Sequence, residues 1–176
     1  MGWFSKTIPQ RKWTDTSVAL AQKLQSTASS WYATFRRGAA EHHVSLKSDE
    51  ISDVAKHYIS MLQLSAVAAT LQENAYVTDA TFFLELVYII LTQNPPAALH
   101  REIESLPLAR AGDARESLML WTHSMAREVS TSADNPKLLE ELNRYGTLLV
   151  IQAKIATCEA CDDFKGAEKI RKVFAS

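Results

Sequence analysis

The residues best suited to chemistry in this sequence are two cysteines, Cys158 and Cys161. Their C-x-x-C spacing occurs in redox sites and in zinc sites. A redox pair typically lies at a helix N-terminus, where the dipole lowers the thiol pKa, whereas these cysteines fall near the end of a predicted helix. A zinc site needs two more ligands, and the chain has no third cysteine. We therefore expect structural cysteines, and we predict neither a metal nor a cofactor.

The histidines and serines form no arrangement typical of a catalytic site. The five histidines include no H-E-x-x-H motif, and His42 and His43 fall between two predicted helices. Asp53 precedes His57 by one helical turn, which favours an ion pair on a helix face. No serine lies in a G-x-S-x-G motif, and the scattered glycines cannot form a phosphate-binding loop. The sequence predicts no catalytic residues and favours a protein that is not an enzyme.

One carboxylate lies in an unusual place, inside the apolar stretch from Thr81 to Thr92. Burying Glu85 without a partner is costly, so it should pair with a cation or face a cavity. An alternative hypothesis is therefore a helical small-ligand or metal-binding protein. Its pocket would lie near Glu85, Tyr88, Trp121 and Tyr145. The other interpretation places Glu85 at the edge of an apolar helix face.

The elements that must position these residues are predicted to be helices. Apolar residues recur at steps of three and four along most of the chain, and no stretch shows the sustained alternation of a strand. The predicted helices span about residues 17–37, 49–73, 79–91, 97–106, 114–129, 136–161 and 164–174. Gly38 is expected to end the first helix, and Ser48 to cap the second. Thr78 or Asp79 should cap the third, and Asn135 with the proline after it should begin the sixth.

The fold class follows from these elements and from the composition. The chain has 176 residues, of which 47% are hydrophobic and 22% charged, as in an ordinary globular domain. These values exclude collagen-like, mucin-like and disulfide-built chains. We predict an all-α, single-domain helical bundle of about six to seven helices. Antiparallel helix pairs should surround a central apolar helix from Phe82 to Leu91.

A short C-terminal segment, from Ile155 to Phe174, resembles the hairpin turn of a tetratricopeptide repeat. The resemblance rests on Ala156, on Asp163 with Phe164, and on Ala167 before a basic amphipathic stretch. It covers about 20 residues, and no second copy lies at the ~34-residue spacing of such arrays. It implies one antiparallel helix pair and no repeat array.

Charge is divided unevenly along the chain, although the net charge is −1. Residues 1–47 contain seven basic and two acidic residues, a net charge of +5, so the remainder carries −6. Three of the four tryptophans also lie in this basic part. We predict a basic aromatic N-terminal arm, residues 1–14, and an all-α domain, residues 15–176. The arm residues expected to bind a partner are Trp3, Phe4, Arg11, Lys12 and Trp13.

This division favours a small, soluble, non-catalytic protein that binds another protein, of adaptor, chaperone or inhibitor type. Two other roles stay open for the arm: it could bind a membrane surface, or fold back onto the acidic remainder. Nucleic acid is not the expected partner, because the net charge is close to zero. An apolar helix could also serve a homo-oligomer interface. The first residues lack the apolar run of a secretory signal, so the expected compartment is the cytoplasm.

Overall fold

The computed structural model describes residues 7–94 and 114–175. This part of the chain is helical, with six α-helices and one 3-10 turn and no strand, so the predicted all-α bundle is confirmed. The elements are η1 (Gln10–Lys12), α1 (Trp13–Glu41), α2 (Asp53–Asn74), α3 (Ala80–Thr92), α5 (Ala114–Val129), α6 (Pro136–Ala160) and α7 (Phe164–Ala175). The helix predicted over residues 97–106 lies outside the described residues.

The helix starts follow local hydrogen bonding. Asp79 and Asn135 cap α3 and α6 as predicted, because their side chains accept bonds from backbone N–H groups of the first turn. The predicted cap at Ser48 is wrong. Ser52 caps α2 and accepts from the Ala55 N–H, whereas Ser48 Oγ accepts from Glu50 N within the preceding loop. A serine hydroxyl can cap a helix or stabilise a turn. Here Ser52, the residue directly before α2, caps the helix.

The first helix continues past the glycine at which it was expected to stop. Gly38 is inside α1, which ends at Glu41, and His43 beyond it adopts the left-handed conformation with φ of 55°. A Cβ on Gly38 would lie 2.9 Å from Glu141 Oε2 and 3.0 Å from the Tyr145 hydroxyl. The glycine thus allows close approach of α1 and α6 rather than a chain reversal.

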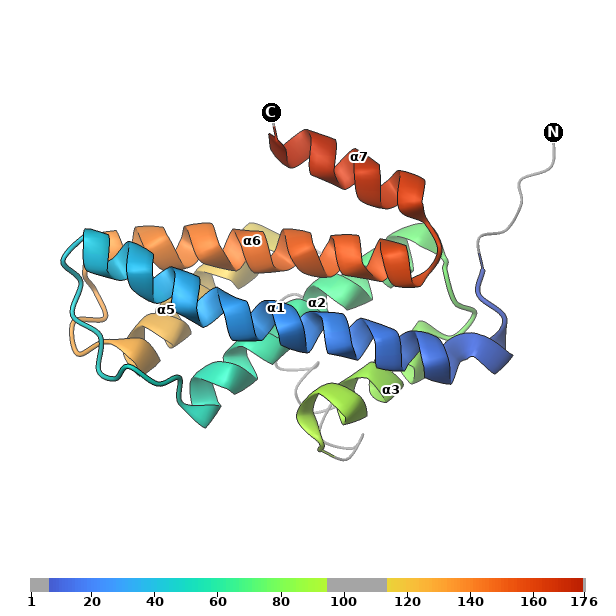
Figure 1. The fold of residues 1–176 in the computed structure, drawn as a ribbon, viewed down its shortest axis with the longest axis horizontal. Coiled ribbons are helices and arrows are strands. Elements are labelled where there is room, and N and C mark those ends of the chain that lie inside the picture. Colours follow the sequence, from blue (N-terminus) through green and yellow to red (C-terminus); the bar gives the residue numbers. More distant parts are fainter. Residues whose placement is uncertain (1–6, 95–113, 176) are drawn as a thin grey trace.

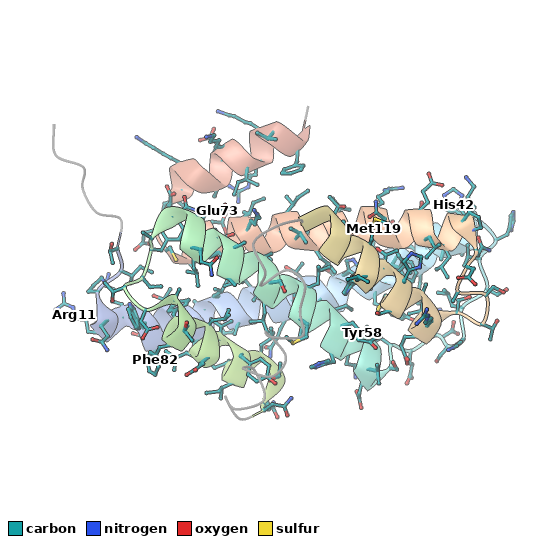
Figure 2. All side chains as sticks on the ribbon, turned by 180° about the vertical axis from the view of Figure 1, so that it is seen from behind. Arg11, His42, Tyr58, Glu73, Phe82 and Met119 are labelled. Atoms are coloured by element: carbon teal, nitrogen blue, oxygen red, sulfur yellow. The ribbon has the colours of Figure 1, made fainter. Side chains whose placement is uncertain are left out.

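Two long helices, α1 and α6, run side by side in opposite directions (Figure 1). On one side of this pair, α2, α3 and α5 form a second layer (Figure 2). Both α6 and α2 pack against four other helices: α6 against α1, α2, α5 and α7, and α2 against α1, α3, α5 and α6. The apolar helix predicted at the centre is α3, which packs against α1 and α2 and leaves Phe82 and Ile89 partly exposed. Its apolar composition extends around the whole helix, so composition alone does not make it central.

The core has two hydrophobic clusters, one toward each end of the bundle. One contains Trp13, Leu24, Tyr76 and Phe83, and the other Trp31, Phe35, Trp121 and Tyr145, among further residues. In the second, the Trp31 ring stacks on Phe35 with centroids 5.3 Å apart and meets Trp121 edge-on. Both indoles donate to backbone carbonyls, which satisfies their buried N–H groups. The helices α1, α2 and α6 each contribute to both clusters.

Candidate functional site

The predicted N-terminal contact residues lie in different environments. Trp3 and Phe4 lie outside the described residues, and Arg11 and Lys12 are exposed. Trp13 is 3% exposed, because its indole donates to the Ile8 carbonyl at 3.0 Å and its ring meets Phe83 edge-on. The chain before it is joined to the body, since Ile8 N donates to Tyr76 O at 2.7 Å. Trp13 therefore belongs to the core, and partner binding by Arg11 and Lys12 stays a prediction.

The four residues of the predicted ligand pocket are distributed over the core. Tyr88 belongs to the first cluster, whereas Trp121 and Tyr145 belong to the second. Glu85 is partly buried on α3. None of the four lines either of the two cavities described below.

The two cysteines lie in a buried polar cluster at the turn between α6 and α7. Cys158 and Cys161 are free thiols and at most 3% exposed. Burial raises the pKa of the Cys161 thiol to about 12. Nearby, the buried Tyr76 hydroxyl donates to Asp163 Oδ2 at 2.6 Å and lies 3.4 Å from Cys158 Sγ. Burial and the Asp163 bond both raise the pKa of Tyr76.

This cluster joins two turns that are far apart in the sequence. Tyr76 lies between α2 and α3, and Asp163 precedes α7. Asp163 also accepts a bond from the Gly166 N–H through Oδ1, so it fixes the start of α7. A thiol with a raised pKa is a poor nucleophile and a poor metal ligand at neutral pH. The cluster is therefore suited to holding the turn in place.

A second buried polar group lies where α1 ends beside α6. Glu141 is 4% exposed, and its Oε1 lies 3.3 Å from His42 Nε2 and 3.5 Å from Arg144 Nη1. Its other oxygen, Oε2, has no hydrogen-bond partner among the described residues and faces Gly38. Sequence reasoning missed Glu141, because its position becomes unusual only when Gly38 of α1 packs over it.

Among the described residues, three of the four large apolar side chains that are more than half exposed lie on α7, and the fourth, Met119, lies on α5. Phe164, Val173 and Phe174 are each more than half exposed. The helix runs back along α6 and diverges from it toward its own C-terminal end (Figure 1). Ala167, Ile170 and Phe174 share one face of α7, yet their exposure rises along it from 0% at Ala167 to 58% at Phe174. The same face is packed at one end and open at the other.

A cavity of about 400 Å³ lies between α1, α6 and α7, beside this divergence. Its lining residues are Lys23, Ser26, Thr27, Gln152, Ile155, Ala156, Glu159 and Arg171. Leu148, 40% exposed, continues the α6 face that carries Gln152 and Ile155. We call this region the α6–α7 wedge: Leu148, Gln152 and Ile155 on α6, with Ile170 and Phe174 on α7.

The rim of the wedge carries two cations and one carboxylate. Glu159 accepts from Lys23 Nζ at 2.8 Å through Oε2, and Arg171 binds its Oε1. The hydrogen bond from Lys23, followed by that from Arg171, lowers the pKa of Glu159. The side chains of Lys23 and Arg171 are about half exposed, so both remain accessible to another molecule.

A larger cavity, of about 750 Å³, lies between α1 and the N-terminal half of α2. Tyr32 and Ile59 are its buried residues, and Ala28, Ile51 and Leu91 are partly buried. Its remaining lining residues are Gln25, Ser29, Ala33, Arg36, Asp49, Glu50, Lys56 and Ser60. Its size is in the range of small-molecule sites.

Three further observations concern metal sites, membrane-spanning helices and similarity to known proteins. No three His, Cys, Asp or Glu side chains in residues 7–94 and 114–175 converge as a metal site would require. Over the same ranges, no helix is both long enough and apolar enough to cross a bilayer. Comparisons of the chain with protein-family models, with curated proteins and with solved structures found no match.

Proposed function

We propose that this protein binds another protein through the α6–α7 wedge and catalyses no reaction itself. The carrying observation is the open end of the α7 face, where Phe174 is 58% exposed although it lies in line with the fully buried Ala167. Large exposed apolar side chains that gather in one place are typical of contact surfaces. A role as an adaptor, chaperone or inhibitor agrees with such a surface.

The shape of the wedge suits an amphipathic helix of the partner. Two helices that diverge leave an apolar groove, and a third helix can fill it with side chains spaced three and four residues apart. Phe174 and Ile170 would pack against one side of such a helix, and Leu148 against the other. Aromatic residues in such positions often supply much of a binding energy.

The charges predict that this partner helix is acidic. The rim holds Lys23 and Arg171 against the single carboxylate of Glu159. On the rest of α7, Lys165 and Lys169 make no ion pair with the described residues. A positive surface favours and accelerates the approach of an acidic partner. Lys165 and Lys169 lie on the face of α7 opposite Ala167 and Phe174, so their charge would act on the approach of the partner and not on contacts within the wedge.

The first experiment is affinity capture from the native host, with three forms of the full chain. The Phe174→Ser variant should lose the partner, whereas Phe164→Ser should keep it. Phe164 is a matched control: it is 64% exposed on the same helix but lies at the packed end, outside the wedge. A captured protein counts only if Phe174→Ser removes it and Phe164→Ser does not.

The decisive measurement is then the dissociation constant between the purified partner and each form of the protein. Phe174→Ser should weaken binding roughly tenfold or more, as expected for a central aromatic contact. The double variant Lys165→Glu and Lys169→Glu should slow association, and the effect should shrink as salt is added. Equal affinity of the partner for the wild type and for Phe174→Ser would refute the proposal that the partner binds at the α6–α7 wedge.

The N-terminal arm is tested in the same capture. A double variant, Arg11→Glu and Lys12→Glu, changes two exposed arm residues and leaves the wedge intact. If it alone removes the partner, the contact surface is the arm, as the sequence predicted. A cytoplasmic location also stays a prediction.

A further inference from the structure

We propose that the cavity between α1 and α2 binds a small organic cation with an apolar body, such as an arylalkylamine. The cavity lies apart from the α6–α7 wedge, and the two sets of lining residues do not overlap. This binding is therefore independent of the proposed partner contact.

The cavity has an apolar floor. The floor is formed by Tyr32, which is 8% exposed, and Ile59, which is 1% exposed. The partly buried Ala28 and Leu91 extend this apolar surface. Small side chains at Ala28, Ser29 and Ala33 leave this face of α1 unfilled. Burial of apolar surface here would supply most of the affinity for a ligand.

One wall of the cavity is a loop that is held in place by hydrogen bonds from α1. Arg36 donates through Nη1 to Asp49 O at 2.7 Å and through Nη2 to the Asp49 carboxylate. The Tyr32 hydroxyl donates to Ser48 O at 3.3 Å. These contacts fix residues 48–51 beside the cavity, so the wall exists before a ligand arrives.

The charged groups at the rim determine whether a cation or an anion binds more favourably. Arg36 and Asp49 satisfy each other, and Lys56 Nζ pairs with Asp53 at 2.8 Å. Glu50 lines the cavity and forms no ion pair with the described residues. The carboxylate left over favours a cation, and the Tyr32 ring in the cavity wall adds a surface on which ammonium groups bind.

The test uses three probes with the same phenylbutyl body: 4-phenylbutylamine, 4-phenylbutanol and 4-phenylbutyrate. Each is titrated into the full chain, and backbone amide shifts are followed by NMR. We expect saturable shifts at Ala28, Ser29 and Ser60, with a Kd on the order of 0.1–1 mM for a fragment of this size. The amine should bind roughly two- to fivefold more tightly than the carboxylate, as one exposed charge allows.

Two variants assign the effect to the cavity. Glu50→Gln should reduce the amine-to-carboxylate preference to about one, whereas Glu140→Gln, which removes a distant exposed carboxylate, should leave it unchanged. Ala33→Trp, at an exposed lining position, should weaken all three probes. Circular dichroism checks that each variant is folded.

Three results would overturn the proposal. Amide shifts confined to residues outside the cavity, or the absence of a saturable shift, would show that the probes do not bind in this cavity. Equal or tighter binding of 4-phenylbutyrate would show that Arg36 and Lys56 determine the preference. A preference that persists in Glu50→Gln would exclude this carboxylate as its cause.

Discussion

Gly146 lies inside α6 at a point where the helix has no room for a methyl group. A Cβ there would lie 2.6 Å from Trp121 Cζ3 and 2.8 Å from Leu118 Cδ1. Trp121 is 8% exposed and its indole donates to Tyr58 O at 2.8 Å, so the ring has little freedom to move. The glycine is required by the packing of α5 on α6.

The first prediction is that Gly146→Ala destabilises the protein. In a helix without crowding, alanine would stabilise by about 1 kcal/mol, whereas overpacking a core costs about 1–3 kcal/mol. We expect the free energy of unfolding to fall by roughly 1–2 kcal/mol, measured by urea denaturation. Gly38→Ala is the control and should cost less, because its nearest contacts, at 2.9 Å to Glu141 and 3.0 Å to Tyr145, are longer than those at Gly146. A more stable Gly146→Ala protein would contradict the packing described.

The second residue-scale prediction concerns alkaline pH. Burial raises the pKa of Cys161 to about 12 from 9.0, so between these values the folded state holds a proton that the unfolded state has lost. This contribution to stability is complete below pH 9 and is lost as the pH rises toward 12. The free energy of unfolding should fall over this range, by at most about 1.4 kcal/mol per pH unit for one group.

The measurement compares Cys161→Ala with the wild type by urea denaturation from pH 8 to 10.5. The wild type should lose stability more steeply with pH, since only it has the Cys161 thiol. The variant also loses packing, but that loss is nearly independent of pH, so only the slopes are compared. Burial also raises the pKa of Tyr76, which adds to the decline above pH 10 in both proteins. Parallel slopes would show that the Cys161 thiol ionises as easily in the folded state.

At the scale of elements, α7 is joined to the body less extensively than the other helices. It packs chiefly against α6, and on its inner face only Ala167 is fully buried. Asp163 and Tyr76 fix its first turn, whereas its last turn diverges from α6 (Figure 1). Local opening should therefore begin at the C-terminal end of α7.

The third prediction is that α7 exchanges its amide hydrogens faster than α1 or α6. Helices with few buried apolar contacts open locally without global unfolding. Hydrogen exchange read by mass spectrometry should show this at neutral pH. Tyr76→Phe should accelerate the exchange of α7 further, because it removes the bond to Asp163, while the middle of α1 should be unaffected. Protection of α7 equal to that of α6 would be the contrary outcome.

At the scale of the whole molecule, the two hydrophobic clusters are parts of one core. Phe35 belongs to one and Phe83 to the other, and both side chains are fully buried. Three helices cross from one cluster to the other, so neither end can unfold while the other keeps its helices intact. This continuity should make unfolding cooperative.

The fourth prediction is a single unfolding transition for Phe35→Ala and for Phe83→Ala. Each substitution should lower the free energy of unfolding by about 3–5 kcal/mol, the usual cost of removing a buried ring. Tryptophan fluorescence and circular dichroism should give the same midpoint in each variant. Two separate transitions in either variant would mean that the clusters unfold independently.

Local signals were sufficient for the class of the fold and for several helix ends. Asp79 and Asn135 cap their helices within one turn, and such bonds depend only on neighbouring residues. Gly38 shows where this reasoning fails. A glycine can end a helix or admit a neighbouring one, and only the approach of Glu141 and Tyr145 distinguishes the two cases.

The candidate sites could not be predicted in the same way. The basic, aromatic arm was visible in the sequence, but Trp13 is buried against Phe83, since an exposed indole is costly when a core can accept it. The wedge depends on the angle between α6 and α7. Nothing in the spacing of Ala167 and Phe174 reveals that the first is buried and the second is 58% exposed.

The sequence by itself determined that this chain forms helices, because hydrophobic periodicity and capping side chains act over a few residues. Tertiary structure decided which helix is central, which aromatic residues are exposed and where the cavities lie. These properties depend on the crossing angles of helices that are distant in the sequence, and packing sets those angles. The uneven charge of the chain was visible from the start, but only the packing placed Lys23 and Arg171 around Glu159 at the rim of a groove.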